Sequence, residues 1–331
     1  MLSPKENVLA ILNGEKPDYI FDFMDATEVL PDPVFLGGIV PNDGKEYQDA
    51  WGTTLCWLPG SPGQHPHVTD ENKVIKDIEY WRDQLTIPSL DGLDWSTAID
   101  VEKKMDAGEK FPMIFCSTGI FERSHFLMGM EDAFCNYLEY PEEMTELLNA
   151  IADYKIEFIH RAAEILKPEM IFYQDDWGSK QNLFLPPDVW REIIKPIQMR
   201  IADAIRECDM MYVHHSDCYA TPIARDMVDL GVRIWQGVIP ENDIVGIQKN
   251  LNDALPMQGG IDVPAIDSEG MPEEKIRAEI RRAFDTYCEN GRFFPGFPGG
   301  FCADKRVDAI ARDGISKYGR IYVQDHYNQG S

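Results

Sequence analysis

The chain has 331 residues, of which 44% are hydrophobic, enough for one large α/β barrel or two ordinary domains. Its formal net charge of −26 excludes a nucleic-acid binder, because phosphate contacts need a basic surface. We expect a cytoplasmic protein. No apolar run approaches the about 20 residues of a membrane span, no signal-peptide pattern opens the chain, and its seven scattered cysteines contain no Cys-x-x-Cys pair.

Short β-rich runs alternate with longer amphipathic segments along most of the chain. The expected strands, in chain order, are residues 19–24, 112–117, 170–175, 210–216, 232–237, 257–261 and 292–297. Helices between them are expected to begin at Pro141, Pro186 and Pro272, where proline is followed by acidic residues. Pro196 predicts a kink or break inside the second of these helices.

This alternation of strands and helices implies a parallel sheet, either open or closed. A dinucleotide-binding fold has no specific support, since no Gly-x-Gly-x-x-Gly follows the first strand. A closed (β/α)₈ TIM barrel that occupies residues 1–331 as a single domain fits the length better. Residues from about 26 to 110 are irregular and rich in Gly, Pro and Trp, which predicts an insertion or lid near the barrel mouth.

The expected strand at 210–216 leads into the most informative polar segment of the chain. Because successive strand side chains point to opposite faces, His215 and Asp217 are expected to share one face, with His214 and Ser216 on the other. The carboxyl ends of barrel strands are where chemistry occurs, so this segment is a candidate site. The alternative is structural: one histidine ends the strand and Cys218 packs under a helix.

A metal site requires a further ligand from elsewhere in the chain. Zinc takes three or four N, S or O donors, often two from one short segment and one from far away. Cys302 follows the last expected strand in a Gly- and Pro-rich loop that we expect to be exposed. His215, Asp217 and Cys302 are therefore the predicted zinc ligands, with an open position for substrate. Cys218 is an alternative donor, and each cysteine taken alone is more often inert.

Three residues near strand ends are candidates for proton transfer, namely Glu122, Asp176 and His214. Of the paired carboxylates at 175–176, we expect Asp176 to face inwards, and the alternative is a helix-capping role for both. For Glu122 the alternative is an exposed turn with Arg123. Four residues are candidates for substrate contact, three as ring walls and one as a carboxylate: Phe121, Trp177, Phe297 and Asp262.

Three parts of the chain together resemble the uroporphyrinogen decarboxylase superfamily. They are the opening SPKENVLAILNGEKPD at residues 3–18, the DDWG at 175–178 followed by PPDVW at 186–190, and the HSDC at 215–218 with Gly231 further on. The resemblance covers most of the chain except about residues 30–100. It implies a single (β/α)₈ barrel with its site at the C-terminal mouth.

The superfamily has two main chemistries, and the resemblance favours the second. Decarboxylases of uroporphyrinogen have an Arg-rich N-terminal segment that binds the substrate carboxylates. Here residues 19–25 contain no arginine, and Asp22 and Asp25 would repel such a substrate. The other branch comprises corrinoid-dependent methyltransferases, in which zinc held by His-x-Cys and a later Cys activates a thiol. His215, Asp217 and Cys302 occupy these positions, and the Asp in place of Cys suits an oxygen-centred substrate better.

The sequence therefore predicts the methyltransferase component of an O-demethylase. It would move a methyl group from a small methylated compound, most favourably an aryl methyl ether, to the cobalt(I) of cobalamin carried by a partner corrinoid protein. Three alternatives stay open: a decarboxylase of another carboxylated substrate, a thiol methylase, and a non-catalytic scaffold for a corrinoid protein.

Overall fold

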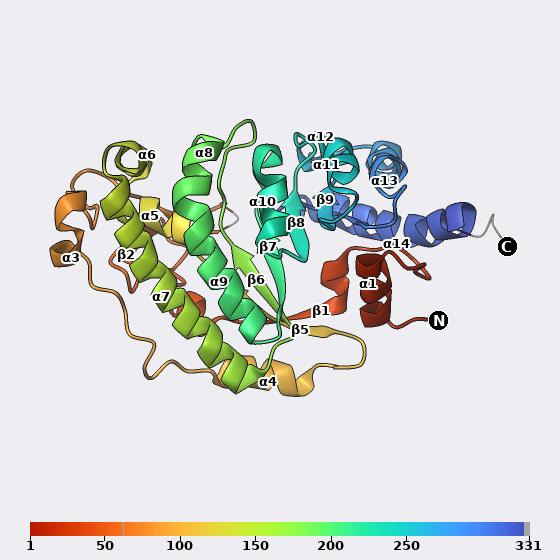
Figure 1. Cartoon of the computed structure of the whole chain (residues 1–331). Coiled ribbons are helices and arrows are strands. Elements are labelled where there is room, and N and C mark those ends of the chain that lie inside the picture. The colour runs from red at the N-terminus through yellow and green to blue at the C-terminus, as the bar shows by residue number, and fades with distance from the viewer. Residues whose placement is uncertain (62, 328–331) are drawn as a thin grey trace.

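The computed structural model describes residues 1–61 and 63–327, and a curled parallel sheet forms its centre (Figure 1). The strands are hydrogen-bonded to their neighbours in chain order, once the strands of a separate small sheet are set aside. They are β1 (Thr27–Leu30), β5 (Phe111–Cys116), β6 (Met170–Gln174), β7 (Met211–His215), β8 (Ile234–Val238), β9 (Met257–Gly260) and β10 (Phe293–Gly296). Because all run parallel, their carboxyl ends meet at one edge of the sheet.

Six of the seven expected strands are present within a few residues of their predicted bounds. The strand expected at residues 19–24 was wrong. The Asp22 side chain accepts a hydrogen bond from the Met24 backbone N–H at 3.1 Å and starts the 3₁₀ turn η1 (Phe23–Ala26). The first strand, β1, follows this turn.

The described residues contain seven strands in the parallel sheet, not the eight of a complete (β/α)₈ barrel, with β1 and β10 at its two edges. The segment before β1 packs against β9 and β10. Gln258 Nε2 donates to both carboxylate oxygens of Asp22 at 3.3 Å, and the rings of Phe23 and Phe294 lie 5.7 Å apart. A parallel α/β sheet is thus confirmed, and the N-terminal segment packs near one edge of it.

The helices follow the strands and pack outside the sheet. They are α1 (Pro4–Asn13), α2 (Pro33–Gly37), α3 (Trp81–Gln84), α4 (Ser96–Lys104), α5 (Ile120–Met128), α6 (Met130–Glu139), α7 (Pro141–Leu166), α8 (Pro187–Val189), α9 (Lys195–Glu207), α10 (Ala224–Asp229), α11 (Ile244–Leu251), α12 (Val263–Ile266), α13 (Glu273–Tyr287) and α14 (Lys305–Tyr327). Further 3₁₀ turns are η2 (Ile78–Tyr80) and η4 (Thr221–Ile223). The long helices α7 and α9 lie side by side in Figure 1.

The helix predicted to kink or break at Pro196 continues through that residue, and its regular α-helical pattern is interrupted just before it. Between α8 and α9 the chain forms a π-helical turn, η3 (Trp190–Ile194), and Pro196 stands in the first turn of α9. Proline lacks the N–H for a regular helical hydrogen bond and its ring crowds the preceding turn. A wider π turn in front of it accommodates both effects.

The segment from 26 to 110 has two structural roles. It supplies β1, together with α4 that packs on β1 and α7. It also forms a small antiparallel sheet of β2 (Glu46–Gln48), β3 (Thr54–Cys56) and β4 (His65–Pro66). Part of the predicted insertion therefore belongs to the central sheet, and a lid role for the remainder stays a prediction.

None of the helices in the described residues is both long enough and apolar enough to span a bilayer.

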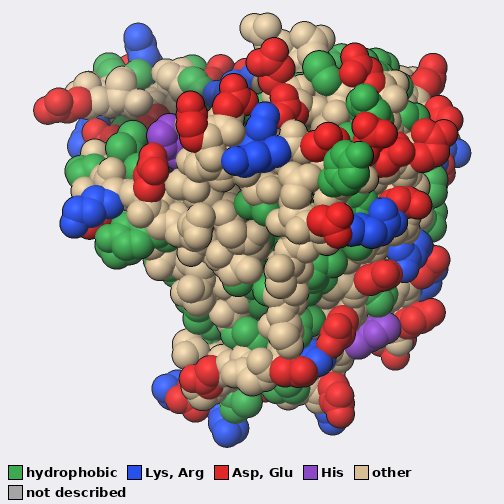
Figure 2. All heavy atoms as spheres, turned by 90° about the vertical axis from the view of Figure 1, so that its left-hand side faces the viewer, with side chains coloured by type: hydrophobic (Ala, Val, Ile, Leu, Met, Phe, Trp, Pro, Cys, Tyr) green, Lys and Arg blue, Asp and Glu red, His purple; other side chains and the backbone are tan. Residues whose placement is uncertain are grey.

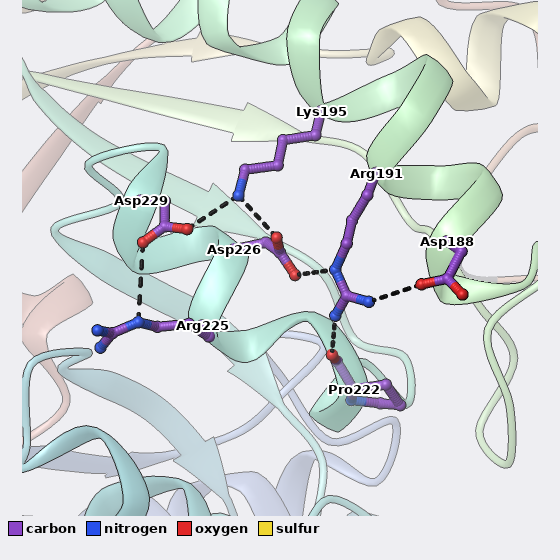
Figure 3. Close-up of polar contacts among 7 residues, drawn as sticks. All are labelled: Asp188, Arg191, Lys195, Pro222, Arg225, Asp226 and Asp229. Atoms are coloured by element: carbon purple, nitrogen blue, oxygen red, sulfur yellow. Dashed lines mark hydrogen bonds and ion pairs between the residues drawn. The ribbon is translucent and has the colours of Figure 1, made fainter.

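A buried carboxylate connects the π turn and α9 to α10 (Figure 3). Asp226 accepts from Arg191 Nε at 3.0 Å and from Lys195 Nζ at 2.7 Å, while its own side chain is only 6% exposed. Arg191 also donates to the Pro222 carbonyl, and Lys195 also bonds Asp229. The side chains of Arg191 and Lys195 thus compensate the buried negative charge of Asp226 on α10.

Replacing Asp226 with Asn is expected to lower the free energy of unfolding by about 3 kcal/mol, because Arg191 and Lys195 lose their buried charged partner and keep only the exposed Asp188 and Asp229. Asp229→Asn is the matched control. Its side chain is 45% exposed and shares Lys195, so it should cost less than about 1 kcal/mol. Urea unfolding followed by circular dichroism measures both, and equal losses would contradict this account.

Candidate functional site

A cavity of about 910 Å³ lies at the carboxyl ends of β5, β6 and β7. One side consists of residues at or just beyond these strand ends, including Phe115, Phe172, Glu122 and His215. The opposite side is formed by residues between 33 and 93, among them Phe35 of α2. The cavity is therefore enclosed between the central sheet and the segment predicted as an insertion.

Asp176, His215 and Asp217 form a cluster in this cavity, with one potential ligand atom of each within 4.8 Å of the others. The strand register explains it, since Gln174 at the end of β6 pairs with His215 at the end of β7. The Asp217 backbone N–H then donates to Asp176 Oδ1 at 2.9 Å. The prediction that His215 and Asp217 share a face is confirmed, as is the inward direction of Asp176.

Asp175 points away from the cavity and fixes the start of α5. Its carboxylate accepts the backbone N–H groups of Phe121 and Glu122 and the indole N–H of Trp177, at 3.2, 2.9 and 3.2 Å. Burial raises the pKa of Asp175 to about 7 despite these three donors. The two adjacent carboxylates thus differ in role: one holds a helix, and the other faces the cavity.

Glu122 is a mostly buried acid among the residues that line the cavity. Burial first, and then the carboxylates of Asp176 and Asp175, raise the pKa of Glu122 well above its ordinary value. Its Oε2 is buried and has no hydrogen-bond partner among the described residues. Burial likewise raises the pKa of Asp176, an effect that His215 opposes and Asp217 reinforces. Burial and the neighbouring carboxylates thus favour the neutral form of Glu122.

A series of aromatic rings leads along the cavity wall to the cluster. The Phe35 and Phe115 rings meet edge to face at 5.3 Å, Phe115 stacks on Phe172 at 5.5 Å, and Phe172 stacks on His215 at 5.2 Å. None of these three rings was among the residues predicted to contact a substrate. Strand periodicity could have found one of them, because Phe172 shares the parity of the inward Asp176.

The rings predicted to contact substrate are instead core residues. Phe121 and Trp177 are each 1% exposed, and Phe297 is fully buried. Phe121 stacks within a group of rings beneath the cavity, and Trp177 lies on the His214 imidazole with ring centroids 4.1 Å apart. Large apolar rings are more stable in the core than on a cavity wall that contacts water. These three rings therefore pack inside the protein.

His214 and Asp262 are also corrected. His214 is fully buried, bonds the Tyr212 hydroxyl through Nδ1 at 3.0 Å and does not line the cavity. Burial lowers its pKa to about 3, so the ring stays neutral and supplies no proton to a substrate. Asp262 caps α12 by accepting from the Ala265 backbone N–H at 3.2 Å. An Asp that follows a strand and precedes a helix is a favoured N-cap, and Asp262 has that role here.

Cys302 does not join the cluster, which corrects the predicted ligand set. A turn closed by the Gly300 N–H on the Phe297 carbonyl brings Gly299 and Phe301 to the cavity and buries Cys302 beside the start of α14. There its backbone N–H donates to Asp308, and burial raises the pKa of the thiol to about 12. Cys218 is equally buried, with its sulfur 3.0 Å from Ser216 Oγ. Asp176 is the third member instead.

The donor set fits a divalent cation. One imidazole nitrogen and two carboxylates are ligands that zinc accepts, and without a thiolate the set is harder than the one predicted. Two carboxylates this close repel each other unless a proton or a cation lies between them. The cluster also leaves room for a substrate oxygen, since the cavity opens next to it.

The fold and the cluster place this protein among α/β proteins whose site lies at the carboxyl ends of parallel strands. Residues 50–296 match the sequence profile of the family described as uroporphyrinogen decarboxylase (URO-D), and the chain belongs to that family. No curated protein sequence matches it. Among solved structures, a methyltransferase from Methanosarcina mazei is similar, with a TM-score of 0.66 and 14% identity over 96% of this chain and 99% of that one. This likeness concerns the fold.

Replacing His215 with Ala is expected to weaken zinc binding by at least about 100-fold, because losing a partner behind a ligand already costs about 10–100-fold. Cys302→Ser is the control and should bind zinc as the unaltered protein does. A chelator competition titration measures both affinities. A loss of zinc affinity in Cys302→Ser as large as that in His215→Ala would instead support Cys302 as a zinc ligand, as predicted from the sequence.

Proposed function

We propose that this protein is a methyltransferase that moves a methyl group from an aryl methyl ether to a reduced corrinoid carried by a partner protein. We further propose that Asp176, His215 and Asp217 hold a divalent cation, zinc being the first candidate. The single observation that carries the proposal is the aromatic-walled cavity that ends at this cluster and at Glu122, whose pKa is raised by burial.

The cavity suits a neutral aromatic molecule. Its volume is within the range of small-molecule sites, and the rings of Phe35, Phe115 and Phe172 offer flat apolar contact. The charges inside it are paired internally: Arg123 binds Asp49 at 2.7 Å, and both side chains are about nine-tenths buried. A dication would balance Asp176 and Asp217, which leaves no net charge to demand an ionic substrate.

Cleavage of an aryl ether requires help for its leaving oxygen. A phenolate is a poor leaving group unless it is protonated or bound to a cation as the bond breaks. Glu122 lines the cavity, and its raised pKa favours the neutral acid that could donate a proton. In the proposed step the methyl–oxygen bond breaks, the methyl group passes to the corrinoid, and the Glu122 proton goes to the phenolic oxygen.

The absent groups supply the rest of the chemistry. A cation held by Asp176, His215 and Asp217 would supply Lewis-acid chemistry to the ether oxygen, and the reduced corrinoid of the partner would be the methyl acceptor. Figure 2 shows acidic side chains, with basic ones among them, along the upper, right-hand and lower parts of the side of the molecule that carries α3 and β2, around a largely uncharged centre. A partner with a basic rim would associate fastest with such a face. The similarity in fold to a methyltransferase agrees with this activity.

Decarboxylation of a substrate with many carboxylates is less well supported, although the family takes its name from that activity. Such a substrate needs several cations. The cavity presents Arg123 already bound to Asp49, and its floor carries Asp176 and Asp217.

The activity is tested by mixing zinc-loaded protein with free cob(I)alamin and a panel of methoxyarenes. We expect methylcobalamin to form, as followed by its absorbance, with release of the matching phenol. Carbon dioxide release from carboxylated arenes would favour the decarboxylase. Absence of transfer from every donor would reject the proposal, and a scaffold would then fit better.

The role of Glu122 is tested by Glu122→Gln with donors of different leaving groups. We expect kcat with methoxybenzene to fall by roughly 10²–10⁴-fold, the usual contribution of a general acid. With 4-nitromethoxybenzene the loss should be much smaller, because that phenolate leaves without a proton. Glu131→Gln, at an exposed position of α6, should change neither rate. Equal losses with both donors would mean that Glu122 is structural.

A further inference from the structure

A line of buried amides runs from His215 away from the cavity. His215 Nδ1 bonds Gln236 Oε1, Gln236 Nε2 donates to Gln258 Oε1 at 2.9 Å, and Gln258 Nε2 donates to both oxygens of Asp22 at 3.3 Å. His215, Gln236 and Gln258 are register partners on β7, β8 and β9. Gln236, Gln258 and Asp22 are each at most 4% exposed. This His215–Asp22 relay is therefore shielded from water.

Backbone groups fix the direction of every hydrogen bond in the relay. Besides Gln258, Gln236 Nε2 donates to the Pro298 carbonyl at 3.1 Å, so both of its protons are used. The Gln236 oxygen therefore faces His215 and can only accept. The orientation of the Gln258 amide is fixed in a similar way. Its oxygen accepts from the Gly237 N–H at 3.4 Å, and its nitrogen donates to the Phe297 carbonyl at 3.5 Å. Neither amide can turn over without losing partners.

His215 must then donate through Nδ1, which leaves Nε2 with a free lone pair. The cluster with Asp176 and Asp217 needs that tautomer if the imidazole is to bind a cation. Backbone packing supports the same assignment. A Cβ placed on Gly237 would lie 3.1 Å from His215 Nδ1, so strand β8 covers that nitrogen.

The far end of the relay is equally confined. A Cβ placed on Gly296 would lie 2.1 Å from Gln258 Nε2 and 2.6 Å from Asp22 Oδ2, so only glycine leaves room for this contact. Asp22 also accepts from the Met24 N–H, which fixes its position before β1. A carboxylate group is thus held behind an imidazole through two amides rather than by direct contact.

We propose that Gln236, Gln258 and Asp22 are positioning residues that hold His215 in the tautomer with Nε2 free, and thereby set the affinity of the cluster for a divalent cation. The inference rests on the metal site of the proposed function. It depends neither on the methyl donor nor on the corrinoid partner.

The test compares two substitutions at Gln236 with a matched control. Gln236→Met removes the acceptor for Nδ1–H and is expected to weaken Co²⁺ binding by about 10–100-fold, the usual effect of losing a partner behind a ligand. Gln248→Met is the control, because Gln248 is a buried glutamine that donates to the Tyr287 carbonyl outside the relay. It should lower the melting temperature and leave Co²⁺ affinity unchanged.

Gln236→Glu separates positioning from simple destabilisation. It keeps an acceptor for Nδ1–H but loses both donated bonds, so a purely structural role makes it as harmful as Gln236→Met. A positioning role predicts that Gln236→Glu binds Co²⁺ at least tenfold more tightly than Gln236→Met, a difference of about 1.4 kcal/mol in binding free energy.

Nitrogen NMR of ¹⁵N-histidine-labelled, metal-free protein gives a second readout. The unaltered protein and Gln236→Glu should show His215 protonated at Nδ1, while Gln236→Met should show a mixture of tautomers. Unchanged Co²⁺ affinity in Gln236→Met, an equal loss in Gln248→Met, or His215 protonated at Nε2 in the unaltered protein would each overturn the inference. The methyl-transfer assay stands apart, so its failure alone would reject the activity and leave this result standing.

Discussion

The candidate site depends on the hydrogen bond from the Asp217 backbone N–H to the Asp176 carboxylate, which joins the chain just after β6 to the chain just after β7. The parallel register brings these ends together, with Gln174 beside His215. It also brings two carboxylates within a few ångströms of each other, an arrangement that is costly unless a proton or cation is shared. The fold therefore maintains a place where positive charge is favoured.

Neighbouring residues at these strand ends have opposite roles because side chains alternate. Asp175 and His214 face the packed layer, where one holds the start of α5 and the other lies against Trp177. Asp176 and His215 face the cavity. A one-residue shift of either strand would exchange these roles, so the apolar packing behind the sheet also determines which polar groups reach a substrate.

The His215–Asp22 relay links the candidate site to the N-terminal segment that packs against β9 and β10. Gln236 and Gln258 lie behind His215, and Gln258 reaches Asp22 in the segment before β1. No ladder joins β1 to β10 within the described residues, so side-chain bonds of this kind secure the N-terminal segment against β9 and β10. Stability near that edge and the orientation of the imidazole thus share the same buried hydrogen bonds.

The sequence by itself determined six of the strands, the helical interruption near Pro196 and the facing of residues 175–176 and 214–217, because periodicity and proline act locally. It placed Cys302 and three aromatic rings wrongly. Whether a loop thiol reaches a site 85 positions away depends on the path of the loop, and whether a ring lines a cavity or fills the core depends on what packs behind it. Only the tertiary structure decided the positions of Cys302 and of the rings. Both depend on packing between distant parts of the chain, which produces no periodic pattern in the sequence.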